Sequence, residues 1–117
     1  MKTSATSTVS KIARKFPRYT MDARLSIQVL RQGEMISLWG RSNEIGEDGI
    51  GGTVTTALEM DEVVSMEFTP PTAAEPLKLR AIVRYRSGLR HGFEFLALKA
   101  KQRDMLRRAC ETLSQRA

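Results

Sequence analysis

The sequence predicts an all-β fold, a six-stranded antiparallel β-barrel followed by a C-terminal α-helix. Short runs that alternate apolar and polar residues recur along most of the chain, with turn residues between them about every eight to twelve residues. No helical pattern interrupts these runs, which favours antiparallel pairing of the strands. From Lys99 onward the apolar residues recur at helical spacing instead.

The first expected strand covers residues 21–29, in which every second residue is apolar. The tripeptide Gln-Gly-Glu at 32–34 predicts a turn into a second strand at 34–41, so that the two strands form a hairpin. Four further strands are expected at 52–58, 63–68, 77–86 and 92–98. We expect the side chains of Trp39 and Tyr85 to pack in the barrel.

The C-terminal helix is expected to carry one apolar stripe, made of Met105, Leu106, Ala109, Cys110 and Leu113. Charged residues of both signs flank this stripe, so we expect the helix to pack on the barrel or on a partner rather than on a membrane. Cys110 is expected to be a small buried apolar residue of that stripe.

The length of 117 residues fits one compact domain. We expect a disordered lead over residues 1–10, a barrel with a basic N-terminal arm over 11–98, and the amphipathic helix over 99–117. The first 15 residues hold no apolar stretch of the signal-peptide type, and no window approaches the ~18 apolar residues of a membrane span. We therefore expect a cytoplasmic protein without membrane insertion.

The chain is basic, with a formal net charge of +6 and 13 arginines against 6 lysines. This balance favours an anionic partner, which leaves open a nucleotide, a nucleic acid, an acidic protein or a membrane surface. A single cysteine and a single histidine, His91, exclude an internal disulfide and leave too few ligands for a zinc site. We expect His91 to be a strand residue without chemistry, and we expect neither a metal nor enzymatic activity.

Two segments stand out as candidate binding elements. Arg14 and Arg18 flank Pro17 just before the first strand, and a guanidinium can pair with a phosphate or donate two bonds to a guanine edge. The same four-residue spacing recurs at Arg80/Arg84, Arg86/Arg90 and Arg103/Arg107, so the spacing alone does not identify a ligand-binding pair. Residues 43–52 hold four of the eight glycines, which indicates a turn or a close approach of the backbone.

The order of these features resembles the PilZ domain family. The resemblance rests on RKFPR at 14–18, on the glycine turn EIGEDG at 44–49, and on the late strand HGFEF at 91–95. It spans about residues 11–98, and it implies a six-stranded barrel followed by a helix. Many members of the family are non-enzymatic receptors for the bacterial second messenger cyclic di-GMP.

The resemblance also implies roles for particular residues. Arg14 and Arg18 would lie on an arm that wraps over the ligand and would contact its phosphates and the Hoogsteen edge of guanine. The turn would form the other wall, where an acidic or amide side chain accepts hydrogen bonds from guanine and Gly49 lets the backbone come close. Glu44 stands where the family motif has Asp or Asn, and Gly46 stands where it has Ser. Asn43 takes the first of these places if the turn is shifted by one residue.

Three functions follow from this interpretation. The first is a cyclic di-GMP receptor, with no other cofactor, that regulates motility or biofilm formation by changing how it binds a protein partner whose identity the sequence does not give. The second is a PilZ-fold interaction module that binds no nucleotide, which the departures at Glu44 and Gly46 favour. The third and least favoured is a basic barrel for single-stranded nucleic acid, because only 7 residues are aromatic and none alternate with basic residues along the strands.

Overall fold

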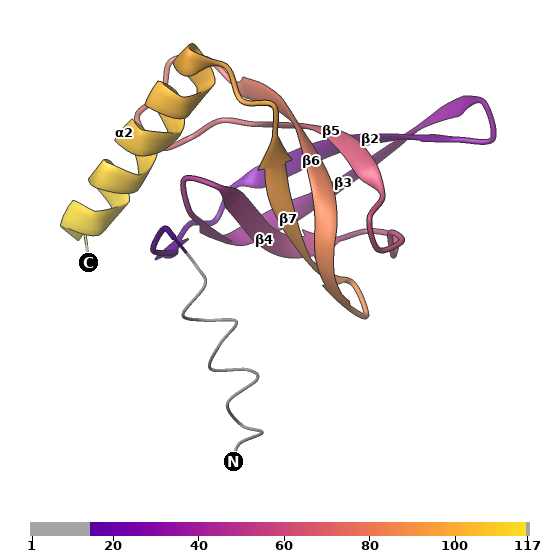
Figure 1. Cartoon of the computed structure of the whole chain (residues 1–117). Coiled ribbons are helices and arrows are strands. Elements are labelled where there is room, and N and C mark those ends of the chain that lie inside the picture. The colour runs from indigo at the N-terminus through magenta and orange to yellow at the C-terminus, as the bar shows by residue number, and fades with distance from the viewer. Residues whose placement is uncertain (1–14, 117) are drawn as a thin grey trace.

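The computed structural model describes residues 15–116, so the expected lead at 1–10 and Arg14 lie outside the described residues. Seven strands precede one helix (Figure 1). The strands are β1 (Tyr19–Thr20), β2 (Arg24–Arg31), β3 (Glu34–Ile45), β4 (Gly49–Val54), β5 (Val63–Phe68), β6 (Leu77–Ser87) and β7 (Arg90–Leu96). The helix is α2 (Ala100–Arg116).

Strands β2 to β7 form a closed six-stranded antiparallel barrel, which confirms the predicted fold class. Neighbouring strands pair in the order β3, β2, β5, β6, β7 and β4, and pairing between β3 and β4 closes the ring. The short strand β1 adds to the outside of this ring because Tyr19 and Thr20 pair with the end of β3. The segment before the barrel is therefore attached next to the turn that joins β3 to β4.

The barrel interior follows from the alternation of apolar residues along each strand. Leu25, Ile27 and Val29 of β2 are almost fully buried, whereas the residues between them are exposed. Strands β5 and β6 repeat this pattern with their own apolar residues. Burial of such side chains stabilises a domain by about 1.5 to 3 kcal/mol each before the entropy of folding is counted.

The glycine-rich segment differs from its sequence-based prediction. Strand β3 continues to Ile45 and β4 begins at Gly49, so the third expected strand at 52–58 begins earlier and the turn is only three residues long. A Cβ on Gly40 would lie 2.2 Å from the carbonyl oxygen of Thr53, and one on Gly52 would lie 2.3 Å from that of Arg41. These glycines therefore let two paired strands approach closely rather than form a turn.

Trp39 and Tyr85 do not pack inside the barrel, which corrects the prediction for both. A β-bulge between Val83 and Tyr85 shifts the register of β6, so Tyr85 leaves the inward row and is 56% exposed. Trp39 is 49% exposed on the outer face of β3, where the guanidinium of Arg24 lies 4.9 Å from the centre of its ring.

The predicted apolar stripe of the helix is confirmed. Leu106, Ala109, Cys110 and Leu113 are buried against the barrel, and burial raises the pKa of the Cys110 thiol to about 11. Gln102 fixes the start of the helix, because its amide nitrogen donates to the carbonyl of Lys78 at 2.7 Å and its amide oxygen accepts from the backbone N–H of Lys99 at 2.6 Å. Between residues 15 and 116 the structure has no helix that is long and apolar enough to cross a membrane.

Ser42 joins β3 to the segment that precedes β2, and its removal is predicted to destabilise the fold. Its buried Oγ accepts from the backbone N–H of Ala23 at 2.9 Å and donates to the carbonyl of Met21 at 2.5 Å. Ser42→Ala would leave both backbone groups without this partner and should lower the free energy of unfolding by about 1 to 2 kcal/mol in urea titrations. The exposed Ser37→Ala control should change it by less than about 0.5 kcal/mol, and equal effects would contradict this role.

His91 is a buried strand residue that holds two loops. The backbone N–H of Leu58 donates to Nε2 at 2.9 Å, so Nε2 is unprotonated and Nδ1–H donates to the carbonyl of Leu89 at 2.8 Å. Burial lowers the pKa of His91 below its ordinary value of 6.5. The folded state therefore favours the neutral ring, whereas the unfolded chain takes up a proton as the pH falls through about 6.5.

The stability that neutral His91 provides should be complete above pH 6.5 and should decline as the pH falls below it. The free energy of unfolding of the wild type is thus expected to decrease between pH 7 and pH 5.5, by at most about 1.4 kcal/mol per pH unit. Because His91 is the only histidine, His91→Gln should remove this dependence from denaturation curves. An NMR titration of the wild-type imidazole that gave a pKa at or above 6.5 would refute the argument.

Candidate functional site

A row of four residues crosses the outer face of the barrel from β3 to β6. Glu44 pairs with Gly51, Gly51 pairs with Gly92, and Gly92 pairs with Tyr85. The two middle positions have no side chain, and the exposed ring of Tyr85 borders them on one side. We call the outer surface over Gly49, Gly51 and Gly92 the glycine face. The backbone there carries no Cβ atoms, and the side chains of Arg18, Glu44 and Tyr85 lie over Gly49, Gly51 and Gly92 instead.

Asn43 and Glu44 border the glycine face on the β3 side. The register of β3 against β4 shifts between Ser42 and Glu44, and this bulge places two consecutive side chains next to the same glycine. A Cβ on Gly51 would lie 3.2 Å from Cγ of Glu44 and 3.4 Å from Oδ1 of Asn43. The structure thus brings both of the alternative acceptor residues to the glycine face.

Arg18 reaches the glycine face from the segment that precedes β1. A Cβ on Gly49 would lie 3.1 Å from one terminal nitrogen of its guanidinium, so the head group lies over Gly49. Its Nη2 lies 3.5 Å from Oδ1 of Asp48, and its side chain is 19% exposed. Within residues 15–116, neither Nε of Arg18 nor Oδ1 of Asp48 makes a hydrogen bond, although both atoms are buried. The two side chains therefore form a close ion pair, but these two buried atoms lack the hydrogen bonds that buried polar atoms usually make.

Gly46 has a packing role that the motif comparison did not anticipate. A Cβ at this position would lie 2.9 Å from the carbonyl oxygen of Pro17 and 3.0 Å from Cδ of Arg18. The absence of a side chain at Gly46 lets the segment with Arg18 lie directly on the turn. Glycine at position 46, where the family motif has serine, thus lacks a hydroxyl and at the same time lets Arg18 lie closer to the turn.

The ionised groups nearest to the glycine face on β6 and β7 already have partners. Arg84 donates to Glu94 at 2.7 Å and contacts Asp61 at 3.2 Å. The hydrogen bond with Glu94 raises the pKa of Arg84, so this guanidinium stays charged. Among the described residues no group of three or more His, Cys, Asp or Glu side chains is placed to hold a metal ion.

The structure gathers five of the six predicted site residues at one place. Arg18, Asn43, Glu44, Gly46 and Gly49 surround the turn between β3 and β4, whereas Arg14 lies outside the described residues. Tyr85, Gly51 and Gly92 also belong to this place but were not predicted as site residues. The alternation along β6 assigned Tyr85 to the interior, and only the bulge reveals its outward position.

The arrangement suits a ligand with a flat heterocycle and a negative charge. An exposed tyrosine beside a bare backbone offers a stacking surface, Asn43 and Glu44 offer hydrogen-bond acceptors, and Arg18 offers a cation. The described chain is thus a small antiparallel β-barrel domain with a candidate ligand site on its outer face.

The sequence matches the model of the PilZ domain family over residues 13–112, and the chain therefore belongs to that family. No curated protein matches the chain. The fold is similar to the PilZ domain with c-di-GMP of YcgR from Escherichia coli, with a TM-score of 0.71, 16% identity and coverage of 89% of this chain and 93% of that one.

Two further solved structures share the fold. The PilZ domain of CeSA from a cellulose-synthesizing bacterium has a TM-score of 0.64 and 16% identity, with coverage of 84% of this chain and 98% of that one. MotI/DgrA, the inhibitor of motility from Bacillus subtilis, has a TM-score of 0.68 and 17% identity, with coverage of 90% and 53%. The chain thus spans about half of MotI/DgrA.

The contact between Gly46 and the preceding segment predicts the effect of restoring the motif serine. In Gly46→Ser the new Cβ would push Pro17 and Arg18 away from the turn, so trypsin should cut after Arg18 faster. Loss of about 1 kcal/mol of local stability corresponds to about a fivefold rise in the rate of cleavage. Mass spectrometry of the fragment that begins at Tyr19 measures this rate. The exposed Ala74→Ser control should leave it unchanged, and an unaltered rate in Gly46→Ser would contradict the packing role.

Proposed function

We propose that the chain is a non-enzymatic receptor for cyclic di-GMP, which binds on the glycine face under the segment that carries Arg14 and Arg18. The observation that carries this proposal is the meeting of Arg18, the acceptor pair Asn43 and Glu44, and exposed Tyr85 around three glycines. Membership of the PilZ family and the similarity to a PilZ domain with c-di-GMP support it.

The guanine base fits between Tyr85 and the acceptor pair. Tyr85, whose side chain lies over Gly92, turns to stack on the face of the base, and Glu44 moves from its place over Gly51 to meet the edge of the base. The Watson–Crick edge of guanine carries N–H donors, and the oxygens of Asn43 and Glu44 accept from them. An adenine ring presents a different set of donors, so this edge gives the site its preference for guanine.

The arginines bind the phosphates and the O6 and N7 atoms of guanine. Arg18 has to exchange its 3.5 Å pairing with Asp48 for these contacts. The exchange leaves the buried Oδ1 of Asp48 without its cation, so the new contacts with the ligand have to outweigh that cost. The Nε donor of Arg18, which has no hydrogen bond among the described residues, gains a partner in the complex.

The proposed receptor acts in the cytoplasm by changing its affinity for a protein partner. The barrel is a single domain, and binding that orders the segment before β1 alters the surface around β1 and α2. The structural similarity to MotI/DgrA, the inhibitor of motility from Bacillus subtilis, favours regulation of motility as the process that is controlled.

The alternative is a PilZ-fold module that binds proteins without a nucleotide. The observation that favours it is the closed arrangement at the turn, where Arg18 lies on Gly46 and pairs with Asp48. In that case the Arg18 contact stabilises the arm and has no role in ligand binding.

Calorimetric titration with cyclic di-GMP, beside GMP and cyclic di-AMP, distinguishes these functions. We expect saturable binding of cyclic di-GMP alone, and about tenfold or greater loss of affinity in Arg14→Ala and Arg18→Ala, since charge-assisted hydrogen bonds contribute about 1.5 to 3 kcal/mol. Tyr85→Ala should weaken binding by about fivefold or more because one stacked base is lost. Arg116→Ala, at the far end of α2, is the matched control. Absence of heat at hundreds of micromolar ligand would refute the receptor function.

A further inference from the structure

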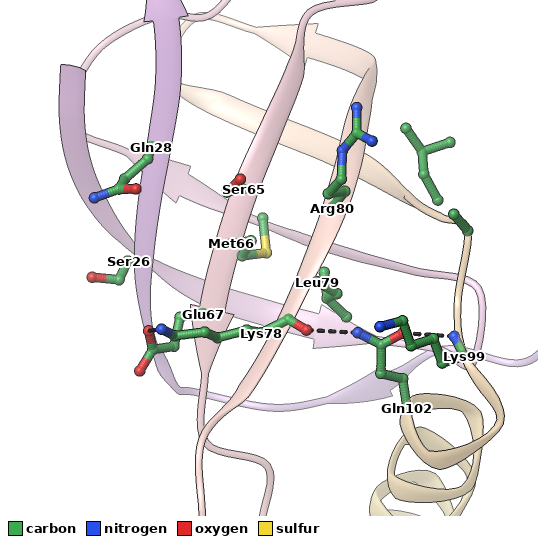
Figure 2. Close-up of a pocket in the computed structure, with 12 residues that line it drawn as sticks. Ser26, Gln28, Ser65, Met66, Glu67, Lys78, Leu79, Arg80, Lys99 and Gln102 are labelled. Carbon is green, nitrogen blue, oxygen red and sulfur yellow. Dashed lines mark hydrogen bonds and ion pairs between the residues drawn. The ribbon is translucent and has the colours of Figure 1, made fainter. Parts of the chain in front are cut away.

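A hollow of about 570 Å³ lies on the outer face of the barrel over β2, β5 and β6, next to the start of α2 (Figure 2). Its floor consists of uncharged polar side chains, Ser26, Gln28 and Ser65, and its rim on the β6 and α2 side carries Lys78, Arg80 and Lys99. We call this hollow the basic groove. It is separate from the glycine face, which lies over β4 and β7.

The strand register explains the shape of the basic groove. Gln28 pairs with Ser65, and Ser65 pairs with Arg80, so one row passes from an amide through a hydroxyl to a guanidinium. The next row passes from Ser26 through Glu67 to Lys78. The two serines on β2 and β5 leave the space, whereas the long cationic side chains of Lys78 and Arg80 on β6 form its wall. The bond from Gln102 to the carbonyl of Lys78 holds the helical side of the wall in place.

The charge of the basic groove is unbalanced. Glu67 is its only carboxylate among the described residues, and this carboxylate lies 3.8 Å from Lys78. Between residues 15 and 116 no carboxylate lies within 4.0 Å of Arg80 or Lys99, whereas Arg31, Arg41 and Arg84 on the strands each have such a partner. Two cations on one wall thus lack a counter-charge, which favours an anionic occupant.

Three exposed apolar side chains, which we call the strip, border the basic groove on the side of the β2–β3 hairpin, whose tip extends beyond the barrel (Figure 1). Trp39 pairs with Ser26 of the groove floor, and Leu30 pairs with Met35 further along the same hairpin, beyond the polar pair of Gln28 and Ser37. Leu30 is 63% exposed, Met35 is 58% exposed and Trp39 is 49% exposed. Tryptophan and methionine are enriched in protein interfaces, so a basic groove beside this strip fits a protein surface.

A polynucleotide fits this surface less well. None of the residues that line the basic groove in the described part of the chain is aromatic, so bases have nothing to stack on inside it. The hydroxyls and the amide of the floor can both donate and accept, as the backbone of an extended peptide requires.

We propose that the basic groove and the strip of Leu30, Met35 and Trp39 form a docking surface for an acidic, extended segment of a protein partner. The carboxylates of the segment pair with Arg80 and Lys99, and an apolar residue beside them packs on the strip. This surface goes beyond nucleotide binding and does not depend on it, because no residue of the glycine face contributes.

Selection of random 16-residue peptides displayed on phage, against the full chain, tests this surface. We expect the recovered peptides to be enriched in Asp and Glu, to quench or shift the fluorescence of Trp39, the only tryptophan, and to bind at least tenfold more weakly to Arg80→Glu. Lys99→Glu is a second variant of the same wall on a different element. Arg116→Glu makes the same change of charge outside the groove and should alter the affinity by less than twofold.

The proposal would be overturned if no peptides were recovered or if the recovered peptides were not enriched in acidic residues. Equal binding to the wild type and to Arg80→Glu would overturn it as well. Displacement of the peptides by a single-stranded oligonucleotide at lower concentration than by an acidic peptide would also overturn it, in favour of nucleic acid. Arg80→Glu should titrate with cyclic di-GMP as the wild type does, and Arg18→Ala should keep its peptide binding. If the protein does not bind cyclic di-GMP, the peptide experiment therefore still tests the basic groove independently.

Discussion

Closure of the barrel depends on the close approach of β3 and β4. Gly40 and Gly52 face backbone atoms of the opposite strand at distances where a Cβ atom has no room, 2.2 Å and 2.3 Å. The same limit applies to Gly49, whose Cβ would lie 2.3 Å from the carbonyl oxygen of Phe93. Any side chain at these positions would force the strands apart and open the ring. The features at the glycine face, including the position of Arg18, exist because these strands can meet.

Two β-bulges then convert the closed barrel into a candidate binding surface. The bulge at Ser42/Glu44 places Asn43 and Glu44 beside Gly51, and the bulge at Val83/Tyr85 turns Tyr85 outward beside Gly92. A regular ladder would alternate these side chains between the interior and the solvent. Both edges of the glycine face are therefore products of irregular register, a common location for functional residues in sheets.

These irregularities also explain what could be predicted from the sequence. The alternation in 21–29 and 63–68 correctly located buried strands, and the spacing of Leu106 and Leu113 correctly located the helix face. The glycines of 43–52 carry no alternation signal and leave a turn and a close backbone approach equally open, so the first half of β4 was not predicted, although the close approach is what Gly49 and Gly52 show. The alternation along β6 predicts an inward Tyr85, because no residue pattern in a single sequence indicates the bulge between Val83 and Tyr85. The motif context predicts Arg18 as a site residue, whereas its contact with Gly46 depends on the three-dimensional arrangement and is seen only in the structure.

The two surfaces of the barrel are joined by a continuous set of contacts outside the sheet. The segment before β1 carries Arg18 at the glycine face, and Phe16 of this segment shares a small cavity of about 180 Å³ with Leu98 and Arg103 near the start of α2. The first turn of α2 in turn holds Gln102, which bonds to β6 at the edge of the basic groove. The ladder between β5 and β6 is regular, and the ladder between β6 and β7 is interrupted only by the bulge between Val83 and Tyr85, so these strands resist small displacements. A structural change at the glycine face that reaches the groove is therefore expected to pass through the N-terminal segment and α2 rather than through the barrel wall.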